Sequence, residues 1–103
     1  ISSGLPSDKF LFEGFLPAKK GRTKRLNELS QENKTIILYE SPHRVLKTLN
    51  DLSSCYNEGT NISISREMTK IHEETFRGTI KESVEYFNKK KLKGEFVIVL
   101  SPN

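Results

Sequence analysis

The chain has 103 residues, the length of one domain, and 34% of them are hydrophobic, so a small independent core is possible. It carries 17 Lys and Arg against 13 Asp and Glu, and the net charge of +4 gives a mild indication of an anionic partner. The sequence contains no apolar run long enough to span a membrane and no zinc-like Cys/His spacing, and its first residues lack the basic and apolar regions expected of a signal peptide. The single cysteine, Cys55, can form no internal disulfide, which predicts a cytoplasmic location. The opening Gly/Pro turn without an initiating Met predicts a piece of a longer polypeptide.

The first half of the chain alternates between predicted strands and helices. Aromatic residues predict a strand over residues 10–15, and two spaced leucines predict a short helix that ends near Gln31. The apolar run of residues 35–39 predicts a strand covered on both faces. Ser41 and Pro42 are typical of a helix start, with Ser41 as the cap. The apolar face of this helix consists of Val45, Leu46, Leu49 and Leu52.

The second half continues the alternation. Residues 62–65 alternate strictly and predict a strand with one buried face, and residues 74–78 predict a weaker strand. Thr79 and Glu82 have the spacing of a capping box, which predicts a helix start. Residues 96–100 predict a last strand buried on both faces. The order predicts an α/β domain whose sheet is flanked by helices, and it leaves open which neighbouring strands run parallel.

A basic segment over residues 19–25 places five cations in seven residues. Such a cluster can neutralise phosphates of a nucleic acid, and a solvated loop is an equally open alternative. No aromatic residue is interleaved with these cations, which argues against a platform that stacks single-stranded bases.

Charged residues, and in one case a glycine, flank three of the predicted strands and are candidates for a binding site. Arg44 opposes the dipole at a helix start, so it needs an anionic partner such as Glu40, Glu67 or a substrate phosphate. An intramolecular salt bridge is the favoured alternative. Residues 65–70 follow a strand and resemble the rim of a site, and Gly94 before the last strand permits either a close approach or a turn. The sequence shows no Gly-rich phosphate loop and no nucleophile–base pair.

Four segments together carry a family resemblance: residues 3–17 with SGLPSD and FEGFLP, residues 38–44 with LYESPHR, residues 66–70 with REMTK, and residues 93–97 with KGEFV. In order and spacing they resemble the C-terminal domain of the tetrapyrrole (corrin/porphyrin) methylase superfamily. The match is to the bacterial branch that 2′-O-methylates a ribose of small-subunit ribosomal RNA. The resemblance covers essentially the whole chain.

The resemblance implies an α/β fold with a mixed, largely antiparallel five-stranded sheet flanked by helices. Residues 1–8 would be an inter-domain junction, and residues 9–103 the C-terminal methyltransferase domain. The N-terminal domain with the Gly-rich cofactor loop would be absent from this chain. S-adenosyl-L-methionine would bind between the two domains, and the whole protein would form a homodimer.

The resemblance also assigns roles to individual positions. The cofactor-binding positions would be Pro6, Tyr39, Glu40, Gly94 and Glu95. The positions that face RNA would be Lys19, Lys20, Arg22, Arg25, Arg44 and Arg66. Glu67 would act as the catalytic base, or Lys70 as a neutral base or electrostatic stabiliser, unless the base comes from the other domain. No metal is expected.

Three alternatives stay open beside this reading. The first is a methyltransferase of the same fold that acts on a corrin or porphyrin ring carbon. The second is a non-catalytic RNA-binding module, and the third is a dimerisation domain whose charges are only solvated. On the leading reading, we expect these 103 residues alone to be inactive, because half of the cofactor cleft is missing.

Overall fold

The computed structural model describes residues 10–57, 59–69 and 72–101, with only the backbone for residues 67–69 and 72–73. The elements in chain order are β1 (Phe10–Phe15), α1 (Arg22–Ser30), β2 (Thr35–Glu40), α2 (Val45–Cys55), β3 (Asn61–Thr69), β4 (His72–Thr79), α3 (Ile80–Asn88) and β5 (Glu95–Ser101). None of the helices in these ranges is both long and apolar enough to cross a membrane.

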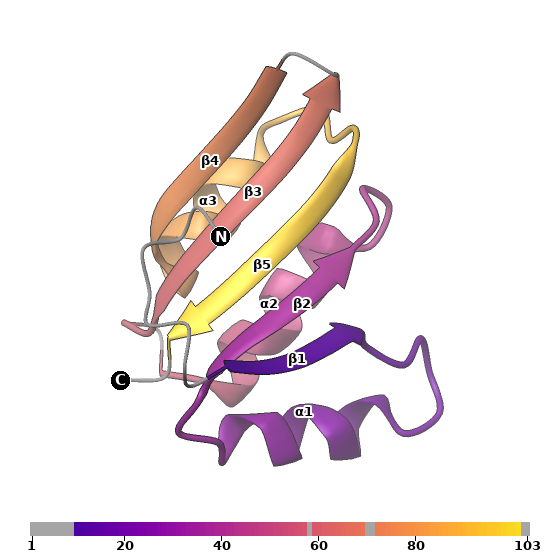
Figure 1. The fold of residues 1–103 in the computed structure, drawn as a ribbon, viewed down its shortest axis with the longest axis vertical. Coiled ribbons are helices and arrows are strands. Elements are labelled where there is room, and N and C mark those ends of the chain that lie inside the picture. The colour runs from indigo at the N-terminus through magenta and orange to yellow at the C-terminus, as the bar shows by residue number, and fades with distance from the viewer. Residues whose placement is uncertain (1–9, 58, 70–71, 102–103) are drawn as a thin grey trace.

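The strands form one five-stranded sheet in the order β1-β2-β5-β3-β4. Strands β1 and β2 are parallel, and the pairs β2–β5, β5–β3 and β3–β4 are antiparallel. Figure 1 shows α2 and α3 behind the sheet and α1 along its β1 edge. The prediction of a mixed, largely antiparallel sheet flanked by helices is therefore confirmed.

The core lies between the helices and one face of the sheet, because alternate strand residues point toward α2 and α3. The buried apolar residues of this face and of the helices are Ile36, Leu38, Ile62, Ile64, Phe96, Ile98, Leu100, Leu26, Leu29, Val45, Leu49, Leu52, Ile80 and Phe87. On the second face, Ile37 and Val99 are buried but Tyr39 is exposed. The predicted burial of the strands on both faces is therefore correct only for part of their length.

The predicted start of α2 at Ser41 is wrong. Residues 41–44 form a turn in which the Ser41 carbonyl accepts hydrogen bonds from the N–H groups of Arg44 (3.1 Å) and Val45 (3.0 Å). The helix begins at Val45, and its N-cap residue Arg44 makes no capping hydrogen bond with its side chain. The Ser41 N–H instead donates to Glu40 Oε1 at 2.9 Å, so the strand end and the turn are joined directly.

The capping box predicted at the start of α3 is confirmed. Thr79 Oγ1 accepts from the N–H of Glu82 at 3.2 Å, and Glu82 Oε1 accepts from the N–H of Thr79 at 2.9 Å. These two bonds satisfy N–H groups that the helix itself leaves without a partner, and they fix where β4 ends and α3 begins.

A β-bulge in β1 changes which side chains share a face. Phe12 pairs with Ile37 and Phe15 pairs with Tyr39, while the register shifts between Phe12 and Gly14. Gly14 has a φ of 73°, a left-handed conformation that glycine adopts without strain. Because of the extra residue, Phe12 and Phe15 lie on the same face of the sheet, opposite the helices.

Candidate functional site

The fold brings the predicted site positions of several segments to one edge of the sheet, the edge at which β1, β2 and β3, which run in the same direction, end. This edge contains the ends of β1, β2 and β3 and the starts of β4 and β5, near the arrowheads of β2 and β3 in Figure 1. Phe96 pairs with both Glu40 and Arg66, and Glu67 pairs with Glu95. Residues separated by more than 50 positions in sequence therefore become neighbours, as a site at a strand edge requires.

Glu40 lies at this edge with its carboxylate turned into the protein. It is 4% exposed, and its Oε2 accepts a 2.6 Å hydrogen bond from the Thr48 hydroxyl while Oε1 accepts from Ser41. The carboxylate is therefore engaged within the chain. What Glu40 offers at the edge is a fixed backbone position.

Arg22, predicted to contact RNA, is instead buried at 6% exposure. Its Nε donates to Asp51 at 2.9 Å, its Nη1 to the Pro17 carbonyl at 3.0 Å and its Nη2 to Thr48 Oγ1 at 3.0 Å. These bonds join the start of α1 to α2, so the geometry gives Arg22 a structural role. A cluster of cations in the sequence does not reveal which member turns inward.

Arg25 is likewise committed to carboxylates. It donates to Glu13 at 2.7 and 2.5 Å and to Glu28 at 2.9 Å. The hydrogen bond to Glu13 is the main cause that raises the pKa of Arg25 above its ordinary value. Because Glu13 belongs to β1, the pair fastens α1 to the edge strand and leaves little of the guanidinium for a phosphate.

Arg66 is buried at 6% exposure on the helix-facing side of β3. Its Nη2 donates to Glu74 Oε1 at 2.5 Å, its Nη1 to the Lys91 carbonyl at 3.3 Å, and its guanidinium lies 5.9 Å from the centre of the Phe96 ring. Glu74 also accepts a hydrogen bond from the Tyr86 hydroxyl. This geometry, too, favours a structural role over the predicted RNA contact.

The remaining predicted cations lie around the loop of residues 18–21, named here the basic loop. Lys19 and Lys20 are exposed and make no ion pair with the carboxylates that the structure describes. Arg44 is half-buried, and its Nη2 donates to the Ala18 carbonyl at 3.1 Å. Arg44 therefore holds the basic loop against the start of α2 through a backbone carbonyl, and it makes no ion pair with the carboxylates whose side chains the structure describes, which do not include Glu67.

Three aromatic side chains, named here the aromatic trio, gather on the second face of the sheet, opposite α2 and α3. Phe12 is 60%, Phe15 61% and Tyr39 39% exposed. The Tyr39 ring meets Phe12 edge-on at 5.3 Å between centroids and Phe15 edge-on at 5.8 Å. The sequence pattern did not indicate this cluster, because its members come from two strands.

The second cofactor-facing position lies at the start of β5. Gly94 has a φ of 84°, so the turn itself requires a glycine there, and Glu95 is exposed. Pro6 and Lys70 lie outside the described residues, as does the predicted junction of residues 1–8, and of Glu67 only the backbone is described.

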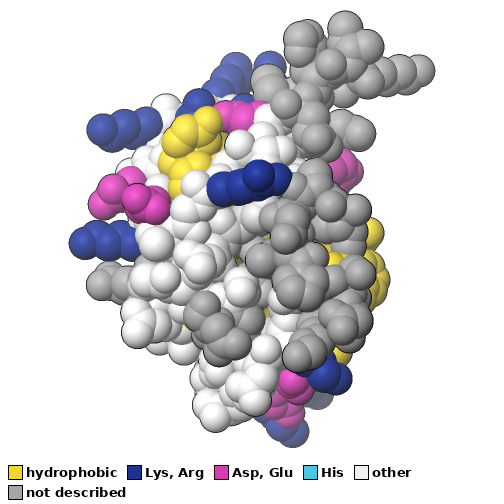
Figure 2. Space-filling view, turned by 60° about the vertical axis from the view of Figure 1, so that its left-hand side comes forward, with side chains coloured by type: hydrophobic (Ala, Val, Ile, Leu, Met, Phe, Trp, Pro, Cys, Tyr) yellow, Lys and Arg dark blue, Asp and Glu magenta, His cyan; other side chains and the backbone are white. Residues whose placement is uncertain are grey.

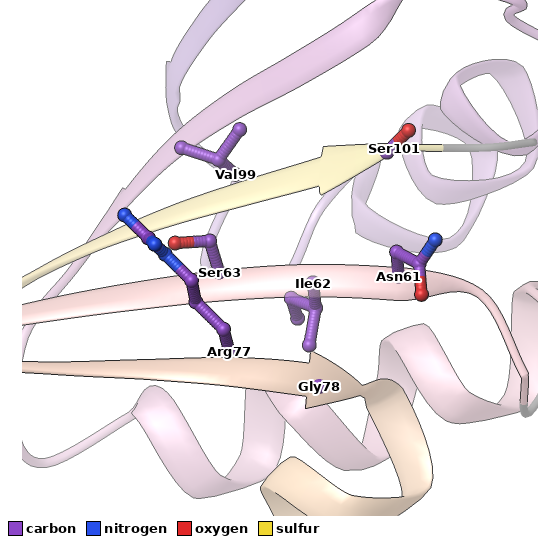
Figure 3. Close-up of a pocket in the computed structure, with 7 residues that line it drawn as sticks. All are labelled: Asn61, Ile62, Ser63, Arg77, Gly78, Val99 and Ser101. Carbon is purple, nitrogen blue, oxygen red and sulfur yellow. The ribbon is translucent and has the colours of Figure 1, made fainter. Parts of the chain in front are cut away.

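A cavity of about 220 Å³ lies at the opposite end of the sheet, over the neighbouring strands β3, β4 and β5. In Figure 3 the Arg77 side chain crosses β3 beside Ser63 and reaches toward Val99 on β5, with Asn61 and Ser101 further along. None of the predicted site residues whose side chains the structure describes lines this cavity.

The face around β4 shows no concentrated basic patch among its described residues. In Figure 2, which looks from that side, Lys and Arg side chains are interspersed with Asp and Glu side chains. Such a mixture favours local ion pairs, for example between Lys90 Nζ and Glu74 Oε2 at 3.6 Å, over the neutralisation of a row of phosphates.

Comparisons with known proteins identify the relatives of this chain. Residues 3–84 match the family described as Tetrapyrrole (Corrin/Porphyrin) Methylases. The chain is 47% identical to the Ribosomal RNA small subunit methyltransferase I of Synechocystis, over 98% of this chain and 37% of that protein. It is 48% identical to the protein of the same name from Thermotoga maritima, over 96% of this chain and 44% of that protein.

A solved structure shares the fold. Cobalt precorrin-4 methyltransferase superposes with a TM-score of 0.68 at 16% identity, over 94% of this chain and 42% of that chain. This chain spans about two fifths of the length of the curated relatives that it matches. Because the family match covers most of the sequence and the fold agrees, the chain belongs to the tetrapyrrole (corrin/porphyrin) methylase family.

Proposed function

We propose that this chain is part of an enzyme that transfers a methyl group from S-adenosyl-L-methionine to a ribose 2′-oxygen of small-subunit ribosomal RNA. The observation that carries the proposal is the 47% and 48% identity, over nearly the whole chain, to two proteins named Ribosomal RNA small subunit methyltransferase I. The likeness to cobalt precorrin-4 methyltransferase, at 16% identity, supports a common fold and does not extend to the substrate.

The residues at the sheet edge fit a nucleoside cofactor. Tyr39 offers an exposed ring beside which an adenine can pack, and the turn at Gly94 presents backbone without a side chain. Glu95 adds an exposed carboxylate that can accept hydrogen bonds from hydroxyl groups. We propose that these residues, with Pro6 and the backbone of Glu40, hold S-adenosyl-L-methionine. When bound, the cofactor supplies an electrophilic methyl group.

The acceptor hydroxyl must lose a proton as the methyl group arrives, so a base must lie within hydrogen-bonding reach of it. Glu67 near the end of β3 is the proposed base, and Lys70 the proposed neutral base or electrostatic stabiliser. Their support is that β3 ends at the same edge as β2, where Tyr39 and Glu40 lie. A base from the remainder of the whole protein is the alternative.

We place the RNA phosphates at Lys19, Lys20 and Arg44, since Arg22, Arg25 and Arg66 are engaged inside the chain. The relatives are more than twice as long as this chain, which supports a second domain that completes the cofactor cleft. We propose that the whole protein is a cytoplasmic homodimer and that these 103 residues alone are inactive.

The test uses the full-length protein, methyl-labelled S-adenosyl-L-methionine and small ribosomal subunits that lack their native modifications. We expect label at one ribose of the small-subunit RNA and a strong loss of label with Arg44→Ala, because that change releases the basic loop. Lys47→Ala is the matched control, since Lys47 is an exposed cation in the first turn of α2, which follows the N-cap residue Arg44. Label on a corrin or porphyrin precursor would contradict the proposal, and RNA binding without label would favour a non-catalytic module.

A further inference from the structure

We propose that the aromatic trio is a surface on which unpaired bases of the RNA substrate stack, beside the phosphate-binding basic loop. Phe12 and Phe15 would offer the stacking faces, and Tyr39 would hold both rings in place. The inference rests on the proposed function, because it presupposes an RNA substrate. It adds a mode of recognition that the cations of the basic loop cannot supply.

The exposure of the trio is the first observation. Among the described residues, four large hydrophobic side chains are exposed, and three of them form this cluster. The fourth, Tyr86, is occupied by a hydrogen bond to Glu74 and by the ammonium group of Lys90, 4.5 Å from its ring centre. Clustered exposed aromatic rings of this kind mark interaction sites, whereas isolated ones need no explanation.

The local geometry leaves at least one face of each phenylalanine ring outside its contact with Tyr39, because a nearly perpendicular pair covers only one face of one of its two rings. Phe12 and Phe15 each meet Tyr39 edge-on, with interplanar angles of 81° and 73°. Without the bulge at Gly14, strand alternation would place Phe15 on the face opposite Phe12, because residues three apart point to opposite sides. The bulge therefore builds the cluster, and bulges are used elsewhere to re-aim side chains at functional sites.

The charge next to the trio determines which partner it fits. The basic loop begins three residues after Phe15, and Arg44 holds it through Ala18 at 3.1 Å. Lys19 and Lys20 are exposed without an ion pair among the described carboxylates. Aromatic rings for bases beside cations for phosphates are the two components of single-strand recognition. An apolar protein surface would match the rings but would leave the cations uncompensated.

The experiment measures binding of the full-length protein to a short single-stranded oligoribonucleotide and to an abasic oligoribonucleotide of equal length, by fluorescence anisotropy. We expect the double variant Phe12→Leu/Phe15→Leu to bind the base-containing probe about tenfold more weakly. Its affinity for the abasic probe should not change. Phe12→Tyr/Phe15→Tyr keeps the rings and should restore parental affinity, which separates stacking from a general loss of fold.

Three results would overturn the proposal: a parental protein that binds neither probe, a leucine variant with parental affinity, or an equal loss for both probes. A change of oligomeric state in light scattering, with RNA affinity unchanged, would assign the trio to a contact between copies and so also overturn it. Because the experiment measures RNA binding, its result does not depend on methyl transfer. A protein that fails to methylate ribosomal RNA would contradict the proposed function and leave the measured RNA affinities unchanged.

Discussion

The buried hydroxyl of Thr48 donates a 2.6 Å hydrogen bond to Glu40 Oε2, which ties helix α2 to the end of strand β2. The Thr48 hydroxyl oxygen also accepts a 3.0 Å hydrogen bond from Arg22 Nη2, and Arg22 Nη1 donates to the Pro17 carbonyl. One hydroxyl thus connects the proposed cofactor-facing strand end with the segment that leads into the basic loop. The parts proposed to meet cofactor and RNA are held in register by this network.

Replacing Thr48 by Val should destabilise the fold, because it leaves two buried charged groups with one partner fewer. The expected loss is about 2 kcal/mol in the free energy of unfolding, the usual cost of a buried polar group left without its hydrogen bond. Thr48→Ser keeps the hydroxyl and should lose much less. Urea unfolding measures both variants, and equal stability of the Val and Ser variants would contradict the role of the hydroxyl.

Gly14→Ala should weaken both the fold and RNA binding. A Cβ at Gly14 would lie 3.8 Å from Phe12, an ordinary contact, so the cost comes from the φ of 73° and amounts to about 1–2 kcal/mol. Relief of that strain would remove the bulge and turn Phe15 away from Phe12. Gly59→Ala is the control, because its Cβ would lie 3.6 Å from Asn57 and its φ is ordinary. If Gly14→Ala keeps parental stability and parental RNA affinity, the bulge at Gly14 is not what forms an RNA-binding aromatic trio.

The order of the elements could be predicted from the sequence because each rests on a local pattern. The alternation of residues 62–65 and the Thr79–Glu82 spacing determine their strand and helix start within a few residues. The start of α2 could not be predicted in this way. The Ser41 N–H donates to Glu40 Oε1, whose carboxylate is also bound by Thr48 of α2, and this contact between strand end and helix has no local pattern in the sequence.

The candidate site was predicted less completely than the fold, because it depends on contacts between distant segments. Arg22 and Lys20 look equivalent in a basic run, yet Asp51 on α2 draws only Arg22 inward. No aromatic residue is interleaved with the cations, yet the bulge in β1 and the parallel pairing with β2 bring the Phe15 and Tyr39 rings together next to them. Gly14 inside a predicted strand is a local signal for a bulge, but the pairing with β2 and the contact of Arg22 with Asp51 have no local signature in the sequence.

Removing Lys19 and Lys20 should lower the salt dependence of RNA binding. For single-stranded nucleic acids the slope of log K against log salt changes by about 0.7 for each phosphate that is neutralised, so the double alanine variant should lose about 1.4. The measurement is anisotropy titration over a salt series with the full-length protein. Lys81→Ala is the control, since Lys81 is exposed at the start of α3, away from the sheet edge of the site. An unchanged slope of log K against log salt in the double variant would show that Lys19 and Lys20 are solvated and do not contact RNA phosphates.

Glu74 should make the stability of the fold sensitive to acid. The Tyr86 hydroxyl, followed by the charges of Arg66 and Lys90, lowers the pKa of the Glu74 carboxyl below its ordinary value of 4.5. A carboxyl with a lowered pKa in the folded state stabilises the fold above its ordinary pKa, and this contribution disappears as the pH falls through the folded-state pKa. We therefore expect the free energy of unfolding to decrease once the pH is lowered past about 4.5. The decrease should be less steep in Glu74→Gln, which has no carboxyl to protonate at this position.

The measurement is urea unfolding at a series of pH values from neutral into the acid range. Glu85→Gln is the matched control, because Glu85 is an exposed carboxylate on the helix that carries Tyr86. The control should follow the parental pH profile, whereas Glu74→Gln should be less stable at neutral pH and converge with the parent in acid. Parallel profiles of stability against pH for the parent and Glu74→Gln would show that the charge of Glu74 does not help to hold β4. The apolar contact between Phe76 and Phe87 would then be the interaction that joins β4 to α3.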